Sequence, residues 1–249
     1  MKILNQIFNI ASDNASSIIV TDVRIGLGYI AVLLENNQAG LAYTFREDFI
    51  EGCSLLHGSL PLAGKKALEL LRFLNSDHSI KTAVGLATVN ALMNNQKPGM
   101  NTGDVIRNIE IRPGDQIGMV GLFTPLIAHL KDKGASLKIF EQNPKRQTDE
   151  TLPIQYMKDE LPKCQVAIIT STSLLNQTIE DLLILTKGCR EVVMLGPSTP
   201  LIPEAFKDTP ASWLSGVIIV NSNQILRIVS EGGGMRDFHN YIRKVNIRL

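Results

Sequence analysis

Apolar and polar residues alternate in three short stretches near the start of the chain, behind an amphipathic helical segment. Apolar residues recur at helical spacing over residues 3–11, whereas residues 17–25 alternate as a half-buried strand does. Two more strands are predicted at residues 29–35 and 39–45, because a short turn of Asn and Gln residues separates them. Neighbouring strands joined by short turns are typical of an antiparallel meander.

Two helices are predicted after this meander. Pro61 opens the first, over residues 61–74, and residues 80–93 form the second. The run Asn-Asn-Gln-Lys-Pro-Gly at 94–99 then interrupts the pattern. We therefore expect a linker or domain boundary within residues 94–113.

From Pro113 onward, short apolar runs alternate with segments of helical length. The expected strands are residues 116–121, 137–141, 166–170, 192–196 and 216–220, and the expected helices are residues 125–133, 155–161 and 178–186. Near-continuous β-branched runs separated by helices are typical of parallel strands buried on both faces. The chain is therefore predicted to be an α/β protein. A Rossmann-like doubly wound parallel sheet over residues 101–249 follows a smaller α+β domain over residues 1–100.

Composition narrows the classes of partner and the location. Of the 249 residues, 44% are hydrophobic and 20% are charged, which suffices for a packed core, and the net charge of +1 gives no reason to expect nucleic acid. No stretch reaches the roughly 18 apolar residues that span a bilayer. Asn5, Gln6 and Asn9 interrupt the first apolar segment, so it does not read as a signal peptide. We expect a cytoplasmic protein without a membrane partner.

The cysteines and histidines do not form a recognisable metal motif. Cys53, Cys164 and Cys189 are far apart and odd in number, which favours free thiols in a reducing compartment. Cys53 and His57 have a spacing that chelates a metal on a helix, but flanking glycines predict a loop there.

The residues that follow each predicted strand are the candidates for ligand binding, because ligands of open parallel sheets bind at the carboxyl ends of the strands. Glu141 lies about 20 residues after Gly121, where a Rossmann domain often places an acid on a ribose hydroxyl. The loop Gly118–Phe123 is not the G-x-G-x-x-G sequence that a dinucleotide requires. An adenosine-like ligand such as S-adenosylmethionine remains an alternative. An acidic residue at the position of Glu141 more commonly has a structural role than a ligand-binding one.

Three polar segments could hold a ligand. The loop from Thr170 to Thr178 carries hydroxyls that could grip an anion, although Thr178 also suits a helix N-cap. A second polar turn runs from Gly196 to Thr199. Glu231 precedes three glycines, which mark either the close approach of a ligand or a hinge. The candidate residues in these segments are Thr170, Ser171, Asn176, Thr178, Glu180, Gly196, Ser198, Thr199, Glu231, Gly232 and Gly233.

Several of these segments resemble the putative heavy-metal-chelation family, long called a domain of unknown function. The resemblance rests on residues 170–183, 195–201 and 230–234. Residues 25–27 and 85–91 look like the companion domain that precedes it in that family. The resemblance implies an N-terminal domain similar to that of enolase, a Rossmann-like C-terminal domain, and an active site proposed between them.

The resemblance also implies which residues match motif positions. These are Asn90, Asn176, Glu180, Ser198, Thr199 and Glu231. Oxygen ligands of this kind suit a hard divalent cation better than a soft heavy metal. A chelating small molecule held between the domains would reconcile the oxygen donors with the family description.

Three hypotheses follow. The first is a protein that binds a metal, a metal complex or a small anionic ligand, with or without catalysis. The second is a transferase with a nucleotide-like cofactor such as S-adenosylmethionine, and the third is a non-catalytic scaffold. A homodimer is possible in each case.

Overall fold

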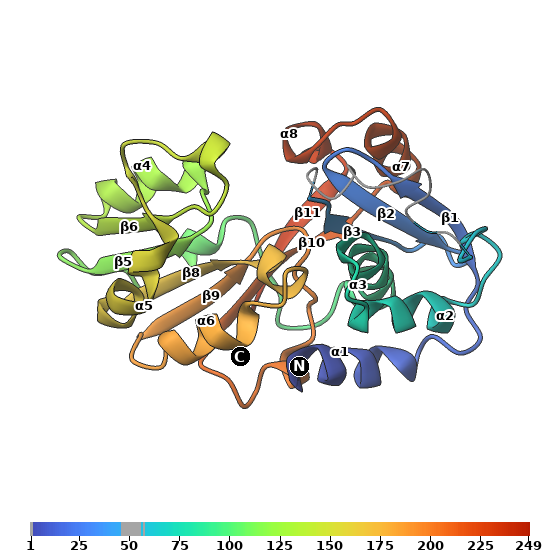
Figure 1. The fold of residues 1–249 in the computed structure, drawn as a ribbon, viewed down its shortest axis with the longest axis horizontal. Coiled ribbons are helices and arrows are strands. Elements are labelled where there is room, and N and C mark those ends of the chain that lie inside the picture. The colour runs from blue at the N-terminus through green and yellow to red at the C-terminus, as the bar shows by residue number, and fades with distance from the viewer. Residues whose placement is uncertain (1, 46–55, 57) are drawn as a thin grey trace.

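The computed structural model describes residues 2–45, 56 and 58–249, which form two sheets and the helices that cover them (Figure 1). Cys53 and His57 lie outside the described residues. The α-helices are α1 Lys2–Ser12, α2 Ala67–Leu71, α3 Ser79–Met93, α4 Thr124–Asp132, α5 Met157–Glu160, α6 Ile179–Leu185, α7 Ser222–Ser230 and α8 Met235–Phe238. The strands are β1 Val20–Ile25, β2 Tyr29–Leu34, β3 Ala39–Tyr43, β4 Asn101–Thr102, β5 Gln116–Val120, β6 Ser136–Phe140, β7 Thr151–Leu152, β8 Val166–Thr170, β9 Glu191–Leu195, β10 Trp213–Ile219 and β11 Ile242–Arg248.

The smaller sheet is the predicted antiparallel meander, in the order β1-β2-β3. Helix α3 packs on one of its faces and is buried along almost its whole length. The approach is close at Gly40 of β3, where an added Cβ would lie 2.1 Å from the carbonyl oxygen of Ala87. Glycine is required there because the helix backbone occupies the space of a side chain.

The other face of this sheet is covered by α7 and α8, which come from the far end of the chain (Figure 1). Tyr29 and Leu41 of the sheet form one buried cluster with Ile225, Val229 and Phe238. Helix α7 passes directly over the β1–β2 turn, since an added Cβ on Gly26 would lie 2.2 Å from the Val229 carbonyl oxygen. The C-terminal segment therefore completes the core of the N-terminal sheet.

The larger sheet has the order β4-β11-β10-β9-β8-β5-β6-β7, and its strands from β5 to β10 are parallel. From β7 to β10 this is the 3-2-1-4-5-6 order of a doubly wound Rossmann sheet, and the order reverses between β5 and β8. The predicted fold class is confirmed. Strands β11 and β4 extend the sheet with antiparallel pairing.

The structure corrects one predicted helix and adds elements that the sequence pattern did not predict. The helix expected from Pro61 begins only at Ala67, because the residues before it pair with β1 instead. The amide of Gly64 donates to the Val20 carbonyl, and the Val20 amide donates to Lys65. The elements α7, α8 and β11 were not predicted at all. In the described part of the chain, no helix has the length and apolar character that crossing a membrane requires.

The packing of α7 on the β1–β2 turn predicts different outcomes for two nearby glycines. Gly26→Ala should lower the free energy of unfolding by about 1–3 kcal/mol, because the new methyl group meets the Val229 backbone. Gly28→Ala is the matched control, since no atom lies within 4 Å of its Cβ position. Urea denaturation of both variants checks this; equal stabilities would contradict the packing.

Candidate functional site

The predicted residues Thr170, Ser171 and Gly196 lie side by side at the carboxyl edge of the larger sheet. Gly121, which ends β5 with a φ of +91°, approaches Thr170 so closely that an added Cβ would lie 3.1 Å from the Thr170 Cβ. The Cβ position of Gly196 lies 2.5 Å from the Ser171 hydroxyl. Three neighbouring strand ends thus meet at the point where the strand order reverses, which is where open α/β sheets bind ligands.

Glu141 extends this row by one strand and is only 5% exposed. Its two carboxylate oxygens accept hydrogen bonds from the backbone amides of Leu122 at 3.2 Å and Asn143 at 2.9 Å. Its own carbonyl accepts a hydrogen bond from Gln147. Glu141 therefore fixes the loops that follow β5 and β6.

Arg146 lies on the short helical turn η4 (Pro144–Arg146) and reaches over the same edge. Its guanidinium donates to the Leu122 carbonyl at 3.0 Å, and its Nε lies 3.7 Å from the Glu141 carboxylate. Its side chain is still 48% exposed, so it keeps donors for a further partner. Sequence analysis missed Arg146, because it lies in a charge-rich stretch without a motif.

An aromatic cluster on the N-terminal sheet lies within reach of the Arg146 charge. Tyr29 stacks edge-to-face on Tyr43 with ring centroids 5.6 Å apart and on Phe238 at 5.2 Å, and Tyr43 stacks on Phe45. Burial raises the pKa of Tyr29, Tyr43 raises it further, and the positive charge of Arg146 acts in the opposite direction. The Arg146 charge therefore favours the ionised form of the Tyr29 hydroxyl, although the two residues lie in different halves of the molecule.

Asn90 and Ser198 join the two sheets directly. The Ser198 hydroxyl accepts a hydrogen bond from the Tyr43 amide at 2.8 Å. The Asn90 amide group donates to the Leu41 carbonyl at 2.8 Å and reaches the Pro197 carbonyl at 3.5 Å. Both side chains are 1% exposed, so these two predicted residues hold the junction together.

Asn94 adds a third polar link that sequence analysis missed. Its carbonyl oxygen accepts from the Leu201 amide at 2.8 Å, and its amide group donates to the Thr199 carbonyl at 3.0 Å. The polar run at 94–99 favoured a linker, and nothing in that pattern distinguishes a buried asparagine from an exposed one.

Some buried polar atoms of the described residues, at or next to the junction between the two sheets, make no hydrogen bond. Within the described residues, Thr44 Oγ1, Asn90 Oδ1 and Thr199 Oγ1 are buried without a hydrogen-bond partner. Asn90 bonds across the junction itself, and Thr44 and Thr199 each adjoin a residue that does so. A buried acceptor without a donor costs about 1–3 kcal/mol, which favours occupation by a donor group or water.

Asn176, Thr178 and Glu180 make contacts at the start of α6 instead. Thr178 is the N-cap residue of α6, as predicted, but its hydroxyl donates to Asn176 Oδ1 at 2.8 Å and makes no capping hydrogen bond with the helix backbone. Glu180 accepts a hydrogen bond from the Ile3 amide at 3.0 Å, which anchors α1 to the Rossmann-like half. These contacts give the three residues a structural role at the start of α6.

The glycines after Glu231 form the turn between α7 and α8. Gly232 has a φ of +79°, and Gly234 begins α8 with its amide donating to Asp237 at 2.8 Å. An added Cβ on Gly233 would lie 2.3 Å from Ile228 Cγ2. Glu231 itself is 62% exposed and pairs with Arg227. A change of direction between two packed helices explains this glycine run.

A bare heavy-metal ion does not fit the donors that the structure describes. Among those residues, no three His, Cys, Asp or Glu side chains cluster as metal ligands. Burial raises the pKa of both Cys164 and Cys189 to about 11, with Cys189 adding to the effect on Cys164. Burial therefore disfavours the thiolate, the form that binds a metal, at both positions.

Comparisons with known proteins place the chain in a family. The DUF364 family model, described as "putative heavy-metal chelation", matches residues 104–248, and the DUF4213 model with the same description matches residues 8–93. The chain belongs to the putative heavy-metal-chelation family. Both the resemblance and its companion domain are confirmed.

Relatives of this family share the whole architecture. An uncharacterized protein of Methanocaldococcus jannaschii is 24% identical over 90% of this chain and 88% of its own length. Crystal structures of DUF364-family proteins of unknown function come from Pyrococcus horikoshii and Desulfitobacterium hafniense. They match with TM-scores of 0.87 and 0.82 at 23% identity, over 99% of this chain and 100% and 98% of theirs. At this identity the likeness shows the fold.

The bonds of Glu141 predict a structural effect that can be measured. Glu141→Gln should lower the free energy of unfolding by about 1–3 kcal/mol, because an amide cannot accept from both the Leu122 and Asn143 amides. Hydrogen exchange at those two amides should accelerate. Glu150→Gln, which removes an exposed ion pair to Lys131, should stay within about 0.5 kcal/mol of wild type. Unchanged exchange would mean that the carboxylate does not fix these loops.

Proposed function

We propose that the protein binds a small anionic ligand where the carboxyl edge of the larger sheet faces β2 and β3. The observation that carries the proposal is the position of Arg146. It is held by Leu122 and Glu141, which follow β5 and β6, it remains half-exposed, and its positive charge acts on Tyr29 of the N-terminal sheet. A fixed guanidinium with unused donors is a strong group for recognising a carboxylate or phosphate.

The surrounding groups also favour an anion. The strand ends carry the partly buried hydroxyls of Thr170 and Thr172, which bond to each other at 3.0 Å beside the Gly121 turn, whereas the Ser171 hydroxyl is buried against Gly196. The backbone amides of Gly121 and Gly196 already donate to the Phe140 and Ser215 carbonyls, so the donors left for a ligand are side chains. The nearest buried carboxylate, Glu141, is already occupied by two amides and lies beside Arg146. Arg146 is therefore the main hydrogen-bond donor that this edge offers to an anion.

The family description is compatible with this site if the metal comes with its own ligands. An anionic chelator, such as a polycarboxylate, surrounds a metal ion with oxygens and presents negative charge outward. The guanidinium and the hydroxyls would then bind the outer surface of the complex. No protein side chain needs to coordinate the metal, which agrees with the donors present in the described residues.

The buried acceptors at the junction supply specificity in this proposal. Asn90 Oδ1, Thr44 Oγ1 and Thr199 Oγ1 would accept hydrogen bonds from a donor of the ligand or from a water beneath it. Predicted residues Asn90, Ser198 and Thr199 then act by shaping and holding the junction. Asn176, Glu180 and Glu231 have structural partners and carry no part of the proposal.

A nucleotide-like cofactor is the second candidate. It is favoured by the Rossmann strand order and by Glu141, which ends the strand beside β5. The carboxylate would have to release backbone amides before it could hold a ribose. Thermal stabilisation by S-adenosylmethionine that Glu141→Ala abolishes would support this candidate, and stabilisation that survives the substitution would exclude Glu141 as its ribose ligand.

The Arg146 proposal is tested by calorimetric titration with citrate, with ferric citrate and with Ni²⁺ alone. Arg146→Ala should weaken the binding of the two citrate species at least about tenfold, because a charge-assisted hydrogen bond contributes about 1.5–3 kcal/mol. Lys145→Ala, which changes the adjacent cation, should alter binding less than about threefold. Tight uptake of Ni²⁺ alone, or equal effects of the two substitutions, would contradict the proposal.

A further inference from the structure

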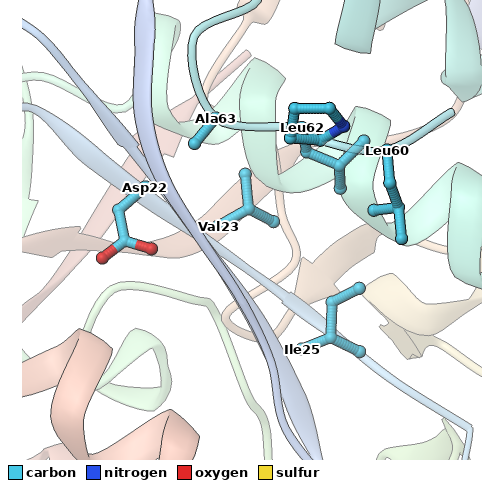
Figure 2. Close-up of a pocket in the computed structure, with 7 residues that line it drawn as sticks. Asp22, Val23, Ile25, Leu60, Leu62 and Ala63 are labelled. Atoms are coloured by element: carbon cyan, nitrogen blue, oxygen red, sulfur yellow. The ribbon is translucent and has the colours of Figure 1, made fainter.

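The outer edge of β1 is open beyond its first residue. Within the part of the chain that the structure describes, β1 is the end strand of its sheet and pairs only with β2 along its length. At Val20 the outer edge is occupied by Gly64 and Lys65, which bond to its backbone. Farther along, residues 60–63 and β1 enclose a hollow of about 480 Å³ (Figure 2).

The backbone groups on this open edge follow from the pairing with β2. Gly26 donates to the Tyr29 carbonyl at 2.9 Å, and the hydrogen-bonded positions of an antiparallel pair alternate. Arg24 and Asp22 therefore bond to β2, opposite Ala31 and Leu33. The amides and carbonyls of the residues between them, including Val23, point outward.

The side chains along this edge divide by face. Val23 and Ile25 point toward Leu60 and Leu62 across the hollow, whereas Asp22 projects from the opposite side of the strand (Figure 2). Ile25 is 36% exposed and Leu60 is 61% exposed. An outward row of peptide groups beside exposed apolar side chains is a surface on which another strand can pair.

The charges of β1 are complementary to themselves. Asp22 and Arg24 flank Val23 and form an exposed ion pair at 2.7 Å. In an antiparallel pair of two such strands with Val23 opposite Val23, each Asp22 lies opposite the Arg24 of the partner. These would be the non-hydrogen-bonded positions, where Cα atoms lie about 4.5 Å apart and side chains are closest.

We propose that β1 pairs antiparallel with the β1 of a second copy of this chain, about a twofold axis at Val23. The charges favour a second copy as the occupant. In an antiparallel pair the order Asp-Val-Arg is complementary in charge to itself, and a foreign strand would need the same order of charges. The pairing joins two three-stranded sheets into one of six strands and covers Ile25 and Leu60. The dimer is weak, since paired strands bury less than the roughly 1,600 Å² of a stable interface.

The test uses two charge-reversal variants of the full chain. Asp22→Arg and Arg24→Asp each place like charges opposite one another in the homodimer, so each should raise the dimer dissociation constant at least about tenfold. Mixed together they should pair with each other, because every cross-strand position then joins Arg to Asp. Like charges remain within each chain of the mixture, so only contacts between chains can restore association.

Sedimentation velocity from about 10 µM to about 500 µM measures the result. The proposal expects a concentration-dependent wild-type dimer, two monomeric variants with wild-type circular dichroism, and a heterodimer in the mixture. A wild-type protein that stays monomeric over this range overturns it. So does a dimer unaffected by either substitution, which would use another face. If one variant fails to fold, Leu60→Glu should weaken the wild-type dimer in its place, and an unchanged dimer would again overturn the proposal.

Discussion

The close packing of α7 against the N-terminal sheet determines how the rest of the molecule is arranged. The sheet has two apolar faces, and its own helix α3 covers only one of them. The second face is buried by α7, which follows the last parallel strand of the Rossmann-like sheet. Gly26 allows the backbone of α7 to approach the backbone of the N-terminal sheet. This packing accompanies the approach of β3 to the carboxyl edge of the larger sheet, where the Tyr43 amide donates to Ser198.

Polar contacts then fix the junction that the apolar packing creates. Asn90, Asn94 and Ser198 each bond to the backbone of the other half, and each is almost fully buried. Such bonds demand one relative position of the two sheets, because a small displacement would leave buried groups unpaired. The candidate site is thus formed from loops whose positions are set by the core beneath them.

The sequence predicted the repeating parts of this structure well. Hydrophobic periodicity predicted the strands of residues 17–45 and the parallel strands of the second half. The candidate loops were then chosen because ligands of open parallel sheets bind at the carboxyl ends of the strands. Helix α7 was missed although its apolar face is strongly one-sided, because no strand pattern after residue 220 pointed to a further helical connection. The helix expected from Pro61 failed since residues 64–65 find backbone partners on Val20, a tertiary contact that local propensity does not contain.

Polar motifs indicated strand ends that meet at the sheet edge, but not the contacts that their individual residues make. Ser171 and Gly196 do meet at adjacent strand ends, whereas Glu180 anchors α1 and Glu231 pairs with Arg227 on the surface. Arg146 could not be found from spacing, because its contacts with Leu122 and Glu141 form only when the sheet is assembled.

The central claim is that an anionic ligand binds at this junction through Arg146. Its most direct test is the anomalous difference density of a crystal soaked in ferric citrate and recorded at the iron edge. The account predicts an iron peak inside a citrate shell whose carboxylate contacts Arg146, with no protein side chain on the metal. An iron ion coordinated directly by protein side chains, or bound citrate far from Arg146, would contradict it.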